Sequence, residues 1–227
     1  DGALSFNSDG SYSFDPGADF QDLKPTESRE VFFTYTATDN DGAVSVPETV
    51  TITVTGTNDI PLVSDDTRSV GEDDVLTGSV PPATDVDGTI DSYTLLSDVT
   101  EGSLTFNSAD GSYSFTPGPD FQDLKPTESR EVTFTYSATD DNGGESAPAT
   151  VTITVTGGND APVLSDTTDP AAVDELVDAS AQDLDAIAGV FTVTDLDAND
   201  TLTATVEGSP AVELNGTPFT LPVGAAA

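Results

Sequence analysis

The sequence predicts an all-β protein made of tandem antiparallel β-sandwich modules, and three observations support this class. A segment of about one domain in length repeats along the chain, and within it apolar residues alternate with polar ones at period two. Gly, Asp, Asn and Pro cluster between the alternating segments. Alternation at period two is typical of half-buried strands. We therefore expect short strands joined by tight turns and packed as two sheets.

The repeat relates residues 2–61 to residues 102–162, with Ala109 as a single inserted residue. Of the 60 aligned positions 46 are identical, and the run from Asp19 to Val31 returns unchanged from Asp120 to Val132. A repeat of about 100 residues has the usual size of one small domain. Tandem copies of this kind are typical of structural arrays rather than of catalytic domains.

Module boundaries are predicted at Asn-Asp-x-Pro, which closes each copy. A Gly before and a Pro after this polar pair are typical of a junction. The junctions give the C-terminal part of a first module (1–59), a complete module (60–160) and the N-terminal part of a diverged third module (161–227). Boundaries near Gly2 and Gly102 are the alternative. We expect the chain to be a piece of a longer protein, because it begins within a repeat.

Seven strands are expected in the complete module, each a short run of alternating apolar and polar residues. They are Leu62–Val70, Val75–Val80, Ile90–Leu96, Leu104–Phe106, Tyr113–Phe115, Val132–Ala138 and Val151–Val155. Asp110-Gly111, between the fourth and fifth, is typical of a hairpin tip. In the sixth strand Val132, Phe134, Tyr136 and Ala138 are expected to share one face.

Residues 173–188 of the third module fit two structures. Val173, Leu176, Val177 and Leu184 recur near helical spacing, and Pro170 would suit a first helical turn. We prefer a loop followed by a strand, because a long amphipathic helix has no obvious place to pack on a sandwich of this size.

The composition excludes several functions. The chain has no Cys and no His, which rules out disulfides, Cys- or His-dependent nucleophiles and the usual zinc sites. With 42 acidic and 5 basic residues its formal charge is −37, so nucleic acid and anionic membranes are not expected as partners. No apolar run approaches the roughly 18 residues that span a bilayer. We expect no enzymatic activity, since paired carboxylates acting on a glycosidic bond are the main chemistry left.

The acidic residues are expected to gather at the two poles of the complete module. Because successive strands run in opposite directions, the loops after the second and sixth strands lie beside the incoming linker, and those after the first and fifth lie beside the outgoing one. The incoming pole would bring together Asn58, Asp59, Asp85, Asp87, Asp140, Asp141 and Asn142. The outgoing pole would bring together Glu72, Asp73, Asp120, Asp123, Asn159 and Asp160, with Asp195 and Asp197 of the third module beyond. Asp39 and Asp41 occupy the corresponding positions in the first copy.

Carboxylates gathered with Asn side chains form an oxygen-only ligand set, which predicts a hard cation with about six to eight ligands, Ca²⁺. A bound ion would offset the repulsion between like charges. The alternative is that these residues only form turns. An EF-hand does not fit, because a loop starting at Asp195 has Asp200 where Gly is needed and Val206 where Glu is needed.

The motifs resemble those of two related groups of repeats. The Asn-Asp-x-Pro linker, the loop Asp85-Val86-Asp87 and the acidic turn at Glu72 resemble the calcium-bound junctions of cadherin repeats. Residues 104–115, 134–143 and 189–197 resemble VCBS repeats, which are cadherin-like and immunoglobulin-like modules of giant RTX adhesins of Gram-negative bacteria. The Asp-Arg-Glu loop of cadherins is missing. The Asp120 and Asp123 carboxylates are expected to replace it.

The resemblance implies a calcium-rigidified extender in a type-I-secreted adhesin on the bacterial cell surface, where it would support attachment and biofilm formation. Its partners would be the neighbouring modules of the same chain, with surface glycans or proteins bound through other domains of the parent.

Two alternatives to the extender function remain. A carbohydrate- or ligand-binding module could use Tyr12, Tyr93, Tyr113 or Phe219, unless these aromatic residues alternate into the core. An isopeptide bond could form at Lys24 and Lys125, although an ion-pair cluster with Glu and Arg is preferred.

Overall fold

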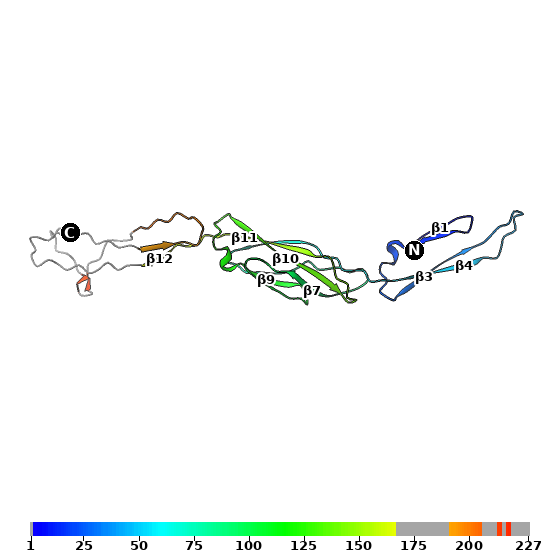
Figure 1. Ribbon diagram of the computed structural model, residues 1–227, viewed down its shortest axis with the longest axis horizontal. Helices are drawn as coiled ribbons and strands as arrows, with labels where there is room; N and C mark the ends of the chain where they lie inside the picture. Colours follow the sequence, from blue (N-terminus) through cyan, green and yellow to red (C-terminus); the bar gives the residue numbers. More distant parts are fainter. Residues whose placement is uncertain (1, 167–190, 206–212, 215–216, 219–227) are drawn as a thin grey trace, which may run out of the picture. The chain divides into compact units, whose positions relative to one another are not determined.

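The computed structural model describes residues 2–166, 191–205, 213–214 and 217–218, which form an all-β protein. Within these residues helical structure is limited to two 3-10 turns, η1 (Gly17–Phe20) and η2 (Gly118–Phe121). The described residues contain no helix with the length and apolar character needed to cross a membrane. The chain separates into two compact units, Asp1–Asn159 and Asp160–Ala227 (Figure 1). The ambiguous stretch at residues 173–188 lies outside the described residues.

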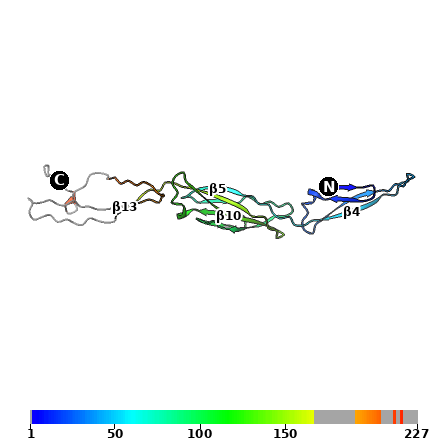
Figure 2. The ribbon, with the colours of Figure 1, turned by 45° about the horizontal axis from the view of Figure 1, so that its top comes forward.

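The middle module contains the seven strands that its sequence predicts. They are β5 (Asp66–Gly71), β6 (Leu76–Ser79), β7 (Ile90–Ser97), β8 (Ser103–Phe106), β9 (Ser112–Thr116), β10 (Ser129–Asp140) and β11 (Ala149–Thr156). One sheet has the order β5-β11-β10-β7 and the other has the order β6-β9-β8. Figure 2 labels β5 and β10, two strands of the first sheet. The predicted two-sheet sandwich is confirmed, and the tip between β8 and β9 turns at Gly111, whose φ is +70°.

One pair of strands departs from the predicted antiparallel arrangement. Strand β11 pairs with β5 in parallel, from Val151 opposite Asp66 to Thr156 opposite Gly71. The reason is geometric: after six reversals of direction the seventh strand runs the same way as the first, so the two can only pair in parallel. The other pairs in both sheets are antiparallel.

The core of the middle module lies between its two sheets. Phe115, Phe121, Phe134, Ile153 and several of their neighbours are completely buried. The ring of Tyr113 packs edge-on against Phe134 at 5.1 Å between centroids, an arrangement favoured for aromatic pairs. The buried hydroxyl of Tyr136 donates a hydrogen bond of 2.8 Å to the carbonyl oxygen of Ser64. The period-two pattern therefore predicted correctly which residues of β10 face inward.

Residues 2–59 form four strands with the registers of the second copy. These are β1 (Ala3–Phe6), β2 (Tyr12–Asp15), β3 (Ser28–Tyr35) and β4 (Glu48–Thr55), paired as β1-β2 and β3-β4. Tyr35 is 42% exposed whereas its counterpart Tyr136 is 0% exposed. Among the described residues the first copy has no counterparts of β5, β6 and β7, the strands that complete the core of the middle module.

The second unit begins with the antiparallel pair β12 (Val163–Asp166) and β13 (Phe191–Thr194). In it Val163 lies opposite Thr194, just as Leu62 forms a bridge with Thr84 in the middle module. The same pairing therefore precedes the Asp-x-Asp loop in both units. Two short strands, β14 (Glu213–Leu214) and β15 (Thr217–Pro218), form a further pair.

Candidate metal centres at the linkers

The linker between the first two modules lies against two loops of the middle module. The side-chain amide of Asn58 donates a hydrogen bond of 2.8 Å to Oδ2 of Asp140, which ends β10. The backbone N–H of Asp59 donates to Oδ1 of Asp87, between β6 and β7, at 3.3 Å. The structure thus brings together linker and loop residues that are 28 to 82 positions apart in the chain.

Asp140 is held by a turn that its own sequence forms. Its Oδ1 accepts hydrogen bonds of 2.8 Å from the N–H groups of Asn142 and Gly144. In the first copy Asp39 accepts equivalent bonds from Asp41 and Ala43, yet Asp39 is exposed whereas Asp140 is only 2% exposed. The turn is therefore a local property, and the burial of Asp140 comes from the surrounding linker and loops.

Two further carboxylates bind the backbone of the loop between β6 and β7: Asp85 lies in that loop, and Asp141 lies in the loop after β10. Oδ1 of Asp85 accepts hydrogen bonds from the N–H groups of Asp87 at 3.1 Å and Gly88 at 2.7 Å. Oδ1 of Asp141 accepts the N–H of Thr89 at 2.9 Å. A Cβ at Gly88 would lie 2.7 Å from Oδ1 of Asp141 and 3.1 Å from Oδ1 of Asp85, so glycine allows both carboxylates to approach the same stretch of backbone.

The electrostatics of this pole favour a cation. Burial raises the pKa of Asp85, and the side chain of Asp87 adds to the rise. Burial alone would raise the pKa of Asp140 too, but hydrogen bonds from Asn58 and from the N–H groups of Gly144 and Asn142 lower it below its ordinary value. The hydrogen bonds thus favour the ionised form of Asp140, whereas burial disfavours the ionised form of Asp85.

Two oxygen atoms at this pole fit a metal ion. Oδ2 of Asp85 and Oδ1 of Asn58 are buried and have no hydrogen-bond partner within the described part of the chain. A buried polar atom left without a partner costs about 1–3 kcal/mol, which an ion bound there would recover. Carboxylate and amide oxygens are the ligands that Ca²⁺ prefers. The residues present therefore fit the predicted ion.

The second unit repeats this arrangement. The N–H of Asp160 donates to Oδ2 of Asp197 at 3.0 Å, as Asp59 does to Asp87. The N–H of Asp197 donates to Oδ1 of Asp195 at 3.0 Å, as Asp87 does to Asp85. Asp197 is 3% exposed, and its Oδ1 has no hydrogen-bond partner among the described residues.

Asp200 joins this second centre, which the sequence analysis did not predict. One oxygen from each of Asp195, Asp197 and Asp200 lies within 4.8 Å of the others. Asn199 has a φ of +61°, and the N–H of Asp200 donates to the carbonyl oxygen of Asp197 at 3.4 Å, so a tight turn returns the chain to the loop. The signal in the sequence is the Asn-Asp pair two residues after the Asp-x-Asp motif.

At the outgoing pole, Glu72 lies against the linker. The side chain of Glu72 is buried, and its Oε1 accepts a hydrogen bond from the N–H of Gly158. Oδ1 of Asp73 accepts the side-chain amide of Gln122 at 3.2 Å. Glu72 thus contacts Gly158, the residue before the predicted ligand Asn159. Asn159 itself is exposed.

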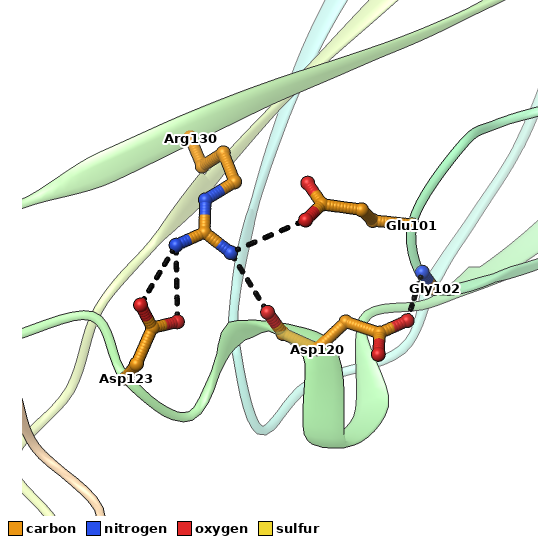
Figure 3. Close-up of polar contacts among 5 residues, drawn as sticks. All are labelled: Glu101, Gly102, Asp120, Asp123 and Arg130. Atoms are coloured by element: carbon orange, nitrogen blue, oxygen red, sulfur yellow. Dashed lines mark hydrogen bonds and ion pairs between the residues drawn. The ribbon is translucent and has the colours of Figure 1, made fainter.

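Asp120 and Asp123 lie in a different cluster from the one predicted. Oδ2 of Asp120 accepts the N–H of Gly102 at 2.8 Å, and both carboxylate oxygens of Asp123 accept hydrogen bonds from Arg130 (Figure 3). Their contacts therefore do not support the prediction that they replace the missing cadherin loop as metal ligands. The cause is Arg130, which lies opposite them at the start of β10.

Comparison with known proteins agrees with the fold. Residues 58–157 match the model of the bacterial cadherin-like domain. Among curated proteins, none matches the chain.

Similar solved structures include cadherin domains and a bacterial adhesin. Protocadherin gamma B7 extracellular cadherin domains 1–4 share 18% identity over 87% of this chain and 48% of that one, with a TM-score of 0.45. The Drosophila N-cadherin EC1-4 structure shares 18% identity over 71% and 40%, with a TM-score of 0.33. The sialic acid binding region of a Streptococcus sanguinis adhesin shares 16% identity over 55% and 37%, with a TM-score of 0.36. The chain thus spans less than half of each of these structures. Over residues 58–157 the middle module is therefore similar in sequence to the bacterial cadherin-like domain.

Proposed function

We propose that this chain is a structural extender of a secreted bacterial surface adhesin, in which calcium ions at the linkers fix consecutive modules relative to one another. One observation carries the proposal. At both linkers the N–H of the linker Asp donates to a buried loop carboxylate. An oxygen of that loop is also buried with no hydrogen-bond partner among the residues that the structure describes, Oδ2 of Asp85 in one case and Oδ1 of Asp197 in the other.

The proposed ligands come from three segments that must stay together for an ion to bind. At the first linker they are Asn58, Asp59, Asp85, Asp87, Asp140 and Asp141, with Asn142 at the edge. In the second unit they are Asp160, Asp195, Asp197 and Asp200, and at the outgoing end of the middle module they are Glu72, Asp73 and Asn159. A bound ion supplies positive charge that neutralises the carboxylates. Because the linker residues then share a ligand set with two loops, the backbone torsions of the linker can no longer vary freely, and the junction becomes stiff.

The wider setting is part of the same proposal. The chain lacks Cys, so disulfides cannot stabilise it, and extracellular calcium can take over that role. We place the protein outside the cell as part of a type-I-secreted adhesin that supports attachment and biofilm formation. Its modules would be residues 1–59, 60–160 and 161–227. The separation into units between Asn159 and Asp160 supports the second of these boundaries.

The alternative function, recognition of a carbohydrate or another ligand, receives little support. Tyr93 and Tyr113, two of the candidate stacking residues, belong to the buried core of the middle module. Tyr12 is 47% exposed, and Phe219 lies outside the described residues. A glycan array probed with the whole chain distinguishes the two functions, because an extender binds none of the sugars.

Calcium-dependent stability tests the proposed function. At a free Ca²⁺ concentration about 100-fold above Kd, binding to the folded state adds about 2.7 kcal/mol to the free energy of unfolding. For a domain of about 100 residues this raises Tm by roughly 10 °C. We expect Asp87→Asn to lose most of the rise measured between EDTA and saturating calcium. Small-angle X-ray scattering of the unmodified chain should report a more flexible particle in EDTA.

The matched control is Glu131→Gln, which removes one negative charge from an exposed position on β10 and should keep the full rise. A Tm of the unmodified chain that does not respond to calcium contradicts the proposal. Equal losses in the two variants would contradict it as well, because the response would then depend on net charge and not on the ligand set.

A further inference from the structure

We propose that the chain contains one more cation site, an oxygen cage at the corner between β9 and β10, and that its permanent occupant is the guanidinium group of Arg130. We call the cluster of Glu101, Gly102, Asp120, Asp123 and Arg130 the arginine corner (Figure 3). This goes beyond the proposed function, because at this corner a side chain, and not calcium, supplies the positive charge that neutralises the carboxylates.

The guanidinium group lies among oxygen atoms from three segments. Its NH2 group donates to both carboxylate oxygens of Asp123, at 2.9 and 3.0 Å, and its NH1 group donates to the carbonyl oxygen of Asp120 at 2.8 Å. Oε1 of Glu101 lies 3.6 Å from NH1 (Figure 3). Two carboxylates and a carbonyl around one positive charge are the ligand types of a hard cation. The planar guanidinium presents two nitrogens in a fixed geometry, so NH2 bonds both oxygens of Asp123 while NH1 bonds the carbonyl oxygen of Asp120.

The corner also joins parts of the fold that are distant in sequence. The carboxylate of Asp120, on η2, accepts the N–H of Gly102 just before β8, while its carbonyl accepts Arg130 at the start of β10. The carbon atom at the centre of the guanidinium lies 5.5 Å from the ring centroid of Phe121, which is completely buried. A guanidinium in this position over an aromatic face gains a cation–π attraction. One side chain therefore connects η2, β10 and the approach to β8.

The first copy builds the same corner independently. Arg29 donates to Asp22 at 2.9 Å and to the carbonyl oxygen of Asp19 at 2.9 Å, and the carboxylate of Asp19 accepts the N–H of Gly2 at 2.8 Å. The guanidinium of Arg29 lies 5.3 Å from the ring centroid of Phe20. These contacts form in a copy whose described residues include no counterparts of β5, β6 and β7. Apart from Gly2, the first-copy residues that make these contacts belong to the run that both copies share, Asp19 to Val31.

An arginine differs from a bound ion because it cannot dissociate. The hydrogen bond from Asp123 raises the pKa of Arg130 above its already high ordinary value, so the cation is present at every pH at which the protein folds. The corner also lies next to the outgoing linker, where the N–H of Gly157 donates to the carbonyl oxygen of Glu128 at 3.0 Å. Removing calcium would therefore free the linkers to change conformation, but the hydrogen bond between Gly157 and Glu128 would still hold the start of the outgoing linker.

The test uses the whole chain and separates the corner from the linkers. In EDTA, Arg130→Gln should lower Tm by roughly 5 °C, because the exposed ion pair with Asp123 is lost together with the hydrogen bond to the carbonyl oxygen of Asp120 and the cation–π contact with Phe121. Asp123→Asn loses only the ion pair and should lower Tm by less. Both variants should keep the rise in Tm that calcium produces in the unmodified chain. Arg68→Gln is the control: it removes an ion pair of 2.7 Å with Asp66, two residues away on the same strand, and should change Tm by no more than about 2 °C.

Two results would overturn the inference. If Asp123→Asn lost the calcium response, Asp123 would be a metal ligand, as the sequence suggested. If Arg130→Gln had the Tm of the unmodified chain in EDTA, the guanidinium group would not stabilise the corner. Should Arg130→Gln fail to fold, Arg130→Lys keeps the charge but lacks the second nitrogen that bonds Asp120 while the first bonds Asp123, and it should give an intermediate Tm. A chain without any calcium response would refute the proposed function and leave the losses measured in EDTA as evidence for the corner.

Discussion

Replacing Gly157 with Ala tests how tightly the end of the middle module is packed. A Cβ at Gly157 would lie 2.6 Å from the carbonyl carbon of Leu124 and in severe overlap with the carbonyl oxygens of Leu124 and Lys125. All three atoms belong to the backbone, so no side chain can rotate away. Gly56 meets the carbonyl groups of Leu23 and Lys24 in the same way. The methyl group therefore forces Gly157 away from the backbone of Leu124 and Lys125, which follows Asp123 of the arginine corner.

The magnitude follows from two opposing effects. Overpacking of a rigid site costs about 1–3 kcal/mol. Restricting the unfolded chain by replacing glycine returns about 0.4–1 kcal/mol. The net loss of about 1–2 kcal/mol corresponds to a fall in Tm of roughly 5–15 °C for a domain of this size.

Thermal unfolding followed by circular dichroism in EDTA measures this effect without a contribution from bound ions. The control is Gly78→Ala in β6, where the added Cβ would make an ordinary contact of 3.4 Å with the ring of Tyr113 and should leave Tm unchanged or slightly raised. If both variants had the Tm of the unmodified chain, the close approach of Gly157 to the backbone of Leu124 and Lys125 would not constrain the protein, and the reasoning would be wrong.

Two further outcomes are expected. Tyr136→Phe removes the hydrogen bond that the buried hydroxyl donates to the carbonyl oxygen of Ser64, an exposed residue, which should lower the free energy of unfolding by about 1 kcal/mol in urea titrations; no change would show that water replaces the bond. Hydrogen bonds from the side chain and backbone of Ser112 lower the pKa of Asp110, so its contribution to stability is lost as the pH falls through that lowered value. Ser112→Ala should move this pKa upward in an NMR titration, while Asp9, lowered in the same way by Ser11 of the first copy, should stay where it is.

The strands and core could be predicted because alternation along one strand reports directly which side chains are buried, as it does for Phe134 and Tyr136. Pairing between strands is a different kind of information. Nothing in the sequences of β5 and β11 states that they are neighbours, and so their parallel pairing was missed. Linker residues such as Asn58 and Asp59 could be placed at a pole because strand direction alone decides at which end a loop lies.

The metal ligands were harder to predict one by one. Asp120 and Asp123 have the residue type of a ligand, but whether a carboxylate faces a metal or an arginine depends on Arg130, which becomes their neighbour only when β10 folds back. Asp200 was missed for a related reason. The middle module has Ile90 at the corresponding position, so the repeat gave no indication that a carboxylate there joins the second centre.

Because β5 and β11 pair in parallel, the middle module resists tension applied along its length. The chain enters the middle module just before β5 and leaves it just after β11, at the opposite end of the pair, so tension between the two linkers acts along both strands. All six residue pairs of this ladder then carry the load in shear at the same moment, whereas a hairpin pulled from its open end would unzip one pair at a time. The middle module is thus built to resist force applied along its length, from one linker to the other.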